Sequence, residues 1–157
     1  MKYQKNVAII IIAVLIVSAL IIFLLNSPKN CGTSDNCFNT KASSCKLAKA
    51  ELDKEGNTLN YQVTGKSGDD CIINVKMVKL AEIQPADLKK ALEGKDMKCV
   101  IPQFLLRERE IKKIQNLNDY CTGQLKESVQ SITIEKLYEI IVKNIGNITL
   151  QLASEKV

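Results

Sequence analysis

Hydrophobic residues occupy all but one of the positions 7–25, near the N-terminus of this chain. The segment contains no charged residue, proline or glycine, and Ser18 is its only polar member. As a helix it would span about 28 Å, which is close to the thickness of the hydrocarbon core of a bilayer. A buried helix of a soluble domain usually keeps a polar stripe, which this segment lacks. We therefore predict a transmembrane helix over residues 7–25, and we group residues 1–28 as a cytoplasmic tip, this helix and a hinge.

The flanks of the apolar segment predict its retention and its orientation. Its apolar core is longer than that of a signal peptide, and the following sequence FLLNSP has no small-x-small cleavage site. Lys2 and Lys5 precede the segment, whereas no acidic residue occurs before Asp35. By the positive-inside rule, we predict a single-pass signal-anchor in the cell membrane with a cytoplasmic N-terminus. Residues 29–157 would then form one extracytoplasmic domain.

Beyond this segment, alternation of apolar and polar residues predicts β-structure. Three segments carry apolar side chains at every second position, which is typical of strands with one buried face. The polar sequences DKEGN and GKSGD separate them and are typical of turns. Residues 97–101 provide a fourth candidate strand. We predict an antiparallel sheet of three to four strands. The three clearest strands are residues 46–52, 58–64 and 71–77.

Apolar residues at helical spacing predict helices that pack on this sheet. Ser34 can cap a short helix that continues through Ser44, and Pro85 can begin a second helix over residues 86–93. Two further apolar stripes predict helices over residues 111–117 and 125–145. Within the longest helix, the β-branched patches at residues 132–134 and 148–150 could be extended instead. The predicted fold class is α+β, a helix-packed and disulfide-stapled sheet that follows the transmembrane helix.

All six cysteines follow the apolar segment, and their number predicts a disulfide framework. An even number of cysteines in a small extracytoplasmic domain is typical of structural bridges. The chain has no histidine and no Cys-x-x-Cys spacing, which disfavours zinc binding and redox chemistry. We predict no metal and no cofactor, and we assign bridges to Cys31, Cys37, Cys45, Cys71, Cys99 and Cys121.

The spacing of the cysteines narrows their pairing. Cys99 and Cys121 flank the segment between the last predicted strand and the long helix, and we pair them first. Cys37 and Cys45 would lie about 12 Å apart on one helix, beyond the limit of about 7 Å for a bridge. Two pairings remain for the other four cysteines: Cys31–Cys37 with Cys45–Cys71, or Cys31–Cys45 with Cys37–Cys71. We favour the first of these pairings.

The charges of the predicted external domain are nearly balanced. Residues 29–157 contain 20 Lys and Arg residues against 17 Asp and Glu residues. The two signs are interspersed, and the only basic clusters are the pairs at residues 89–90 and 112–113. This pattern describes a solvated surface, and it predicts neither a nucleic-acid partner nor a polybasic lipid-binding tract.

Two short motifs raise the question of catalysis. Ser43 and Lys46 match the Ser-x-x-Lys motif of penicillin-binding enzymes, but the companion Ser-Asp-Asn and Lys-Thr-Gly motifs are missing. Asp69 and Asp70 are adjacent in a predicted turn, where two solvated carboxylates are the simpler interpretation. A Ser-His-Asp triad is impossible without histidine. We predict no catalytic residue and favour a non-enzymatic role. Asn147, in the sequence Asn-Ile-Thr, is a candidate glycosylation site.

The order of the cysteine-containing segments resembles that of a known group of proteins. The sequence DNCF and a further cysteine precede a predicted hairpin, and GDDC, GKDMKC and DYCTGQLKE follow in turn. This order is similar to that of small prokaryotic membrane-anchored proteins with a six-cysteine external domain. The resemblance implies an anchored, stapled domain, and it supplies no catalytic residue or activity.

Three functions are compatible with these features. We favour a non-catalytic binding or structural module at the outer face of the membrane, with an envelope or surface protein as a candidate partner. The main alternative is an envelope hydrolase that uses Ser or Asp and Glu side chains. A pilin-like filament subunit is a weaker alternative, because a pilin leader needs glycine before the apolar segment, where this chain has Asn6.

Overall fold

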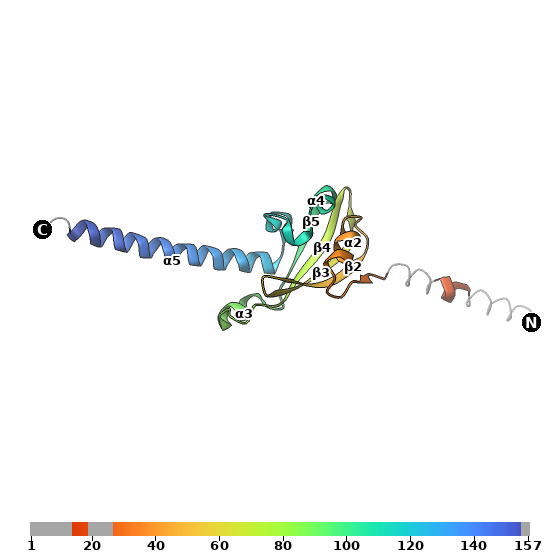
Figure 1. The fold of residues 1–157 in the computed structure, drawn as a ribbon, viewed down its shortest axis with the longest axis horizontal. Helices are drawn as coiled ribbons and strands as arrows, with labels where there is room; N and C mark the ends of the chain where they lie inside the picture. Colours follow the sequence, from red (N-terminus) through yellow and green to blue (C-terminus); the bar gives the residue numbers. More distant parts are fainter. Residues whose placement is uncertain (1–13, 19–26, 155–157) are drawn as a thin grey trace, which may run out of the picture.

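The computed structural model of this chain describes residues 14–18 and 27–154, with side chains described through residue 144. Residues 14–18 are helical. A β-sheet with helices packed against it forms the body of the molecule, and a long C-terminal helix projects from that body (Figure 1). We refer to residues 27–132 as the body and to residues 133–144 as the projecting segment.

The sheet has six strands, each paired with the next strand along the chain. The last five strands form an antiparallel meander, in which Ala50 lies opposite Tyr61 and Leu59 lies opposite Met77. The first strand is the exception, because it pairs with the second in parallel. The strands are β1 Lys29–Asn30, β2 Ala48–Lys54, β3 Asn57–Ser67, β4 Asp70–Lys79, β5 Asp96–Pro102 and β6 Cys121–Thr122.

The predicted fold class is therefore wrong in its sheet, which is six-stranded and mixed where three to four antiparallel strands were expected. The two additional strands, β1 and β6, contain two residues each. Strands this short cannot display the two-residue alternation from which the others were predicted. Lys29, which directly follows the expected hinge, donates its backbone N–H to the carbonyl of Leu47 at 3.0 Å.

The predicted transmembrane helix also finds no support in the structure. Among the residues that the structure describes, no helix is both long enough and apolar enough to cross a membrane. Of residues 7–25, only residues 14–18 belong to this set, and the remainder of the predicted span lies outside it.

The hairpin between β2 and β3 shows how the sequence fixes the register of the sheet. Glu55 and Gly56 form its two-residue loop, with φ values of 57° and 80°. Positive φ at both positions is typical of a type I′ turn, whose twist matches that of antiparallel strands. The side chain of Asp53 accepts a hydrogen bond from the N–H of Gly56 at 3.1 Å. This turn aligns Lys54 with Asn57 and so sets the pairs that follow.

The helices agree only in part with the sequence prediction. The first begins after Ser34, whose hydroxyl accepts a hydrogen bond from the N–H of Cys37, as expected of a cap. The segment 111–117 is not one helix, because a 3₁₀ helix over Ile111–Lys113 is followed by an irregular stretch and a second 3₁₀ helix begins only at Leu117. A further short helix after Pro102 was not predicted. The elements are α2 Asp35–Ala42, α3 Ala86–Leu92, α4 Gln103–Glu108, η1 Ile111–Lys113, η2 Leu117–Tyr120 and α5 Gln124–Ser154.

One face of the sheet forms the core, and the other face is polar. The buried side chains of β2 to β5 alternate along each strand, as the sequence predicted. The helices cover this face with a small number of buried residues, namely Phe38, Ala42, Leu92, Leu106, Ile111 and Leu125.

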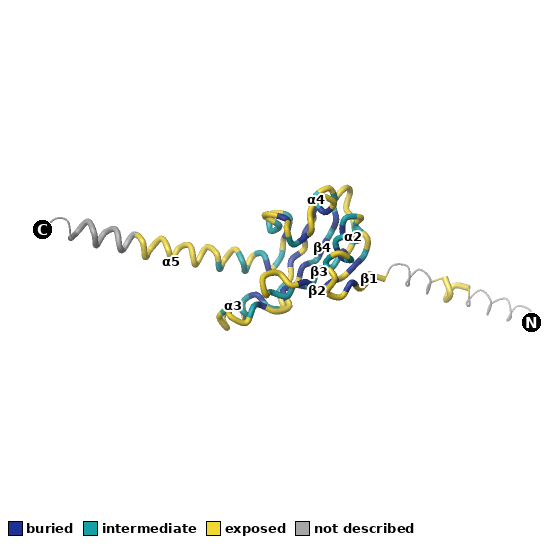
Figure 2. Tube along the Cα trace, viewed as in Figure 1, coloured by how far each residue is buried: buried dark blue, intermediate teal, exposed yellow. Residues whose placement is uncertain are grey.

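Helix α5 departs most from the expected packing. Both β-branched patches considered as extended are helical, since α5 is continuous from Gln124 to Ser154. Only its first turns contact the core, through Leu125, Val129 and Ile132. From residue 133 onwards every described residue is exposed (Figure 2). The prediction that the whole apolar stripe covers the sheet is therefore wrong beyond Ile132.

Candidate binding site

The six cysteines form three disulfides, in the pairing that the sequence favoured. One bridge joins the loop after β1 to the first turn of α2, and the second joins the turn after α2 to β4. The third joins β5 to β6, immediately before α5. All three lie in the body of the molecule, and the pairs are Cys31–Cys37, Cys45–Cys71 and Cys99–Cys121.

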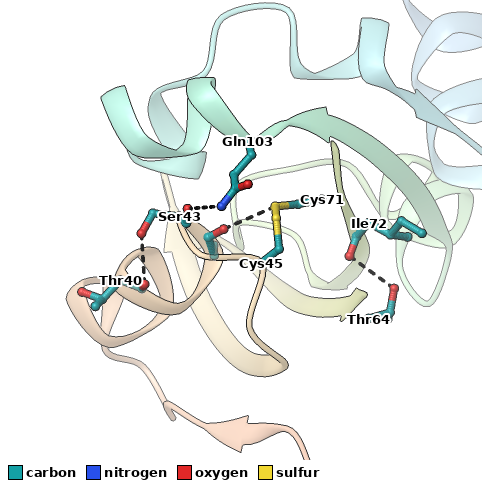
Figure 3. The surroundings of a disulfide bond; sticks show 8 residues. Thr40, Ser43, Cys45, Thr64, Cys71, Ile72 and Gln103 are labelled. Carbon is teal, nitrogen blue, oxygen red and sulfur yellow. Dashed lines mark hydrogen bonds between the residues drawn. A yellow bond between two sulfur atoms is a disulfide. The ribbon is translucent and has the colours of Figure 1, made fainter. Parts of the chain in front are cut away.

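The bridge between Cys45 and Cys71 holds several elements together (Figure 3). Cys45 lies before β2 in a left-handed conformation, with φ of 50°, and its Cα lies 5.3 Å from that of Cys71 on β4. The side-chain amide of Gln103 donates a hydrogen bond to the carbonyl of Ser43 at 3.0 Å. The end of α2 is thereby fixed to β4 through sulfur and to the start of α4 through an amide.

The residues of the catalytic alternatives have structural contacts near this bridge. The hydroxyl of Ser43 donates to the carbonyl of Thr40 at 3.0 Å, and Lys46 is exposed. The carbonyl of Asp69 accepts a hydrogen bond from the N–H of Gln103, and Asp70 pairs with Ser67 across the hairpin. The contacts of Ser43 and of the Asp69 carbonyl thus stabilise the turns in which they lie. Asn147 belongs to α5, outside the region with described side chains.

A cavity of about 380 Å³ opens between the core face of the sheet and the segment that carries the two 3₁₀ helices. Its floor is formed by apolar side chains of β3, β4 and β5, among them Leu59, Val75 and Met97. The first turns of α5 close another side with Leu125 and Val129. Its size lies within the range of small-molecule pockets, which are mostly apolar with a few polar groups.

The polar groups of the cavity come from two separate parts of the chain. Lys54 lies at the end of β2. Asn116 directly precedes the second 3₁₀ helix, and Asn118 belongs to that helix. Asn116 has a left-handed conformation with φ of 54°, which asparagine tolerates better than most residues. One ammonium group and two amides thus accompany an apolar interior.

Polar contacts hold this segment over the sheet. The ammonium of Lys112 lies 2.8 Å from the carboxylate of Asp35 and also donates to the carbonyl of Asp53 at 3.0 Å. The N–H of Ile111 donates to the side chain of Asn39 at 3.2 Å. Because these contacts join the segment to both α2 and β2, they fix the wall of the cavity next to Lys54.

Tyr61 places a neutral phenol beneath the cavity. Its side chain is 2% exposed, and its ring lies 5.9 Å from that of Phe38. Burial, and secondarily the negative charge of Asp35, raises the pKa of Tyr61 to about 12. The phenol therefore keeps its proton at neutral pH and can act as a hydrogen-bond donor.

Gly123 allows α5 to begin close to β5. A Cβ atom at this position would lie 3.1 Å from both the carbonyl oxygen of Asp96 and the Cα of Met97, and the backbone has φ of +125°. The ammonium of Lys95 donates to the hydroxyl of Ser128 at 2.7 Å. This close approach brings Leu125 onto the core and places Val129 at the cavity.

Sequence reasoning identified the floor of this cavity but not its opening. Tyr61 and Val75 were predicted to lie on the buried face, and the alternation of polar and apolar residues was sufficient for that. The role of Asn116 and Asn118 was missed, because a continuous helix was expected up to residue 117. The polar pair enclosing Leu117 in the sequence NLND is the signal that could have indicated a break.

Comparisons with protein-family models, curated protein sequences and solved structures find no match to this chain. The resemblance to membrane-anchored proteins with six cysteines therefore stays a prediction.

Proposed function

We propose that this chain is a non-catalytic binding module that recognises an apolar group through the cavity between the sheet and residues 114–118. The observation that carries the proposal is the composition of this cavity. Apolar side chains form most of its lining, and its charged and amide groups are limited to Lys54, Asn116 and Asn118. Such a combination binds an apolar group by burial and orients it through a small number of polar contacts.

The same groups define the chemistry of the ligand. The ammonium of Lys54 favours an anionic or carbonyl oxygen, and the amides of Asn116 and Asn118 can donate to the same group. We therefore propose an apolar chain or side chain that ends in a carboxylate or a carbonyl. A short acyl chain and an apolar side chain of a partner protein, with its adjacent backbone carbonyl, share this chemistry.

We further propose that the module acts outside the cytoplasm, at the cell membrane and with a cytoplasmic N-terminus. The uncharged sequence of residues 7–25 and the two preceding lysines support this placement. The three disulfides support it independently, because such bridges persist in oxidising compartments. An envelope or surface protein is the partner that this location favours. Protease added to intact cells should therefore remove a tag fused after Val157, and full protection of that tag would contradict the placement.

The binding proposal can be tested by NMR on residues 27–157, since the described core begins at Cys31. Met77 and Met97 both line the cavity, and the only other methionine is Met1. Methyl-¹³C methionine therefore gives two signals at the proposed site. Titration with octanoate should shift both methyl signals in a saturable manner.

Matched variants separate specific binding from general contact with apolar surfaces. Lys54→Gln should weaken octanoate binding by roughly five- to tenfold, because a neutral amide attracts the carboxylate less strongly. Lys49→Gln provides the control, since Lys49 lies on the same strand but not at this cavity. Val129→Trp should block the cavity and abolish the shifts. Equal binding by all three variants, or no methyl shift in the unmodified protein, would contradict the proposed site.

A further inference from the structure

The projecting segment of α5 exposes a continuous apolar surface. Six large apolar residues lie within it, and each is about half exposed or more. Figure 2 shows this part of the helix extending into solvent beyond the body. Helix α3 borders one edge of this surface, because Leu88 and Leu92 line a groove together with Leu137 and Ile140. The apolar residues of the surface nevertheless stay exposed, and they are Ile134, Leu137, Tyr138, Ile140, Ile141 and Val142.

These residues occupy one broad face of the helix. At about 100° per residue, they fall within an arc of roughly 200° centred near Ile141. Four charged residues occupy the remaining side, within roughly 100°, and they are Glu135, Lys136, Glu139 and Lys143. Two acidic and two basic residues leave this side without net charge, so it offers little attraction to an anionic membrane or to a strongly charged partner.

The projecting segment is also a poor helix by intrinsic propensity. Thr133, Ile134 and the run Ile140 to Val142 are β-branched and lose side-chain freedom in a helix. Most helical stability in proteins comes from the packing of an apolar face, which the body does not provide here. A helix of this composition therefore requires a partner surface along its apolar side.

The spacing of its residues indicates what this partner is. Ile134, Leu137, Ile141 and Asn144 follow one another at intervals of three, four and three residues. These intervals match the spacing of core positions in the coiled-coil heptad over about one and a half repeats, and helices of the same pattern pack side by side in such assemblies. The six apolar side chains provide an area of the same order as the roughly 800 Å² that each partner contributes to a standard interface.

We propose that the projecting segments of two or more copies of this chain associate as a parallel coiled coil. Asn144 favours the parallel direction. In a parallel assembly it lies opposite Asn144 of the other copy, and the two amides can form a hydrogen bond. In an antiparallel pair centred on Glu139, it would instead face Ile134 and leave an amide against an apolar side chain. A polar residue at a core position of a coiled coil is a known determinant of register.

Cysteine cross-linking of the full-length chain in its membranes tests this assembly. Ile141→Cys places a thiol at the centre of the apolar face, and Glu139→Cys places one on the charged side. The native cysteines do not interfere, because all six form bridges. Mild oxidation should link Ile141→Cys into a species of twice the chain mass at least tenfold more efficiently than Glu139→Cys. Two differently tagged copies should appear together in that species.

Additional variants make each outcome decisive. Ile134→Lys, combined with Ile141→Cys, should remove the cross-link while the three native disulfides remain intact by peptide mapping. Leu137→Cys provides a second exposed position that should also link to its own equivalent. Equal linking of Ile141→Cys and Glu139→Cys would overturn the proposal. Cross-links that form only between a Leu137→Cys copy and an Ile141→Cys copy would indicate antiparallel packing and would also overturn it. A cross-link from Ile141→Cys to a different protein would overturn it as well.

Discussion

The two ends of α5 carry similar residues in opposite environments. Leu125 lies against the sheet and is 2% exposed, whereas Leu137 on the projecting segment is 55% exposed. Around Leu125, the close approach at Gly123 and the Lys95–Ser128 hydrogen bond bring the helix onto β5. Beyond Ile132 the helix no longer packs into the core, although Leu88 and Leu92 of α3 line a groove together with Leu137. An apolar stripe in a sequence therefore shows that a surface will be covered, but not which molecule covers it.

The body and the projecting segment also differ in how they are held. In the body, three disulfides, a six-stranded sheet and contacts such as Lys112–Asp35 act together. In the projecting segment the Thr133 hydroxyl donates within the helix, to the Val129 carbonyl, and the apolar side chains stay about half exposed or more although α3 borders some of them. We therefore expect substitutions in the body to change its own stability, and substitutions in the projecting segment to change association.

The largest effect should come from removing the bridge between α2 and β4. Replacing both Cys45 and Cys71 by Ser opens a loop with a sequence separation of 26, which should lower the free energy of unfolding by about 3.5 kcal/mol. The matched replacement of Cys31 and Cys37, with a separation of 6, should cost about 2 kcal/mol because the shorter loop constrains the unfolded chain less. Urea denaturation of residues 27–157 measures both. Equal losses would show that loop length does not determine the contribution of these bridges.

Truncation of the two leucines tests the contrast within α5 directly. Leu125→Ala should destabilise the body by about 3 kcal/mol, because it leaves a cavity in the core. Leu137→Ala should cost less than about 0.5 kcal/mol at concentrations where the chain is monomeric, because its side chain is already exposed. Urea denaturation at low protein concentration provides the comparison. Similar losses for the two variants would mean that the body does bury the projecting segment.

High pH should weaken the body through Tyr61. Because its folded pKa of about 12 lies above the ordinary value near 10, the unfolded chain loses this proton first as pH rises. The stabilising contribution is thus complete below pH 10 and decreases above it, by about 1.4 kcal/mol at pH 11. Tyr61→Phe should remove this part of the pH dependence. Tyr138→Phe, at an exposed position of the projecting segment, should leave it unchanged, and an equal effect of the two variants would contradict the assignment to Tyr61.

The smallest effect should come from the ion pair that fixes the cavity wall. Lys112→Met removes a partly exposed contact to Asp35 and a hydrogen bond to Asp53, which should cost about 1 kcal/mol or less. Lys113→Met removes the neighbouring exposed pair with Glu110, and it should have almost no effect. Thermal denaturation at low and high salt distinguishes the two. A larger loss for Lys113→Met would show that the cavity wall is held in another way.

How much could be predicted from the sequence depended on the length of each pattern. The strands from β2 to β5 contain at least seven residues each, which is long enough to show alternation and to identify Tyr61 and Val75 as buried. Strands β1 and β6 contain two residues and depend on pairing with distant segments, so local sequence could not reveal them. The sequence narrowed the pairing of the cysteines to two choices by placing Cys37 and Cys45 on one helix. Helix α2 in fact ends at Ala42, before Cys45, and the observed bridges are those of the favoured choice.

The cavity and the exposure of the projecting segment could not be predicted from the sequence for a different reason. The opening of the cavity depends on the break between the two 3₁₀ helices, and tertiary contacts of Lys112 hold the chain on the N-terminal side of that break. The periodicity of α5 correctly predicted a helix, but it is the same on both sides of Ile132. Only the position of the sheet determines where the contact with the body ends.

The central claim is that the body is stable by itself, whereas the projecting segment is stabilised by association with other copies of the chain. Hydrogen exchange tests this claim most directly. It should be measured by mass spectrometry on the full-length chain over a range of protein concentrations. Amides of β3 and β4 should be equally protected at every concentration. Protection of residues 133–144 should increase with concentration, and Ile134→Lys should abolish that increase without changing the sheet. Protection of residues 133–144 that is independent of concentration and unaffected by Ile134→Lys would contradict this account.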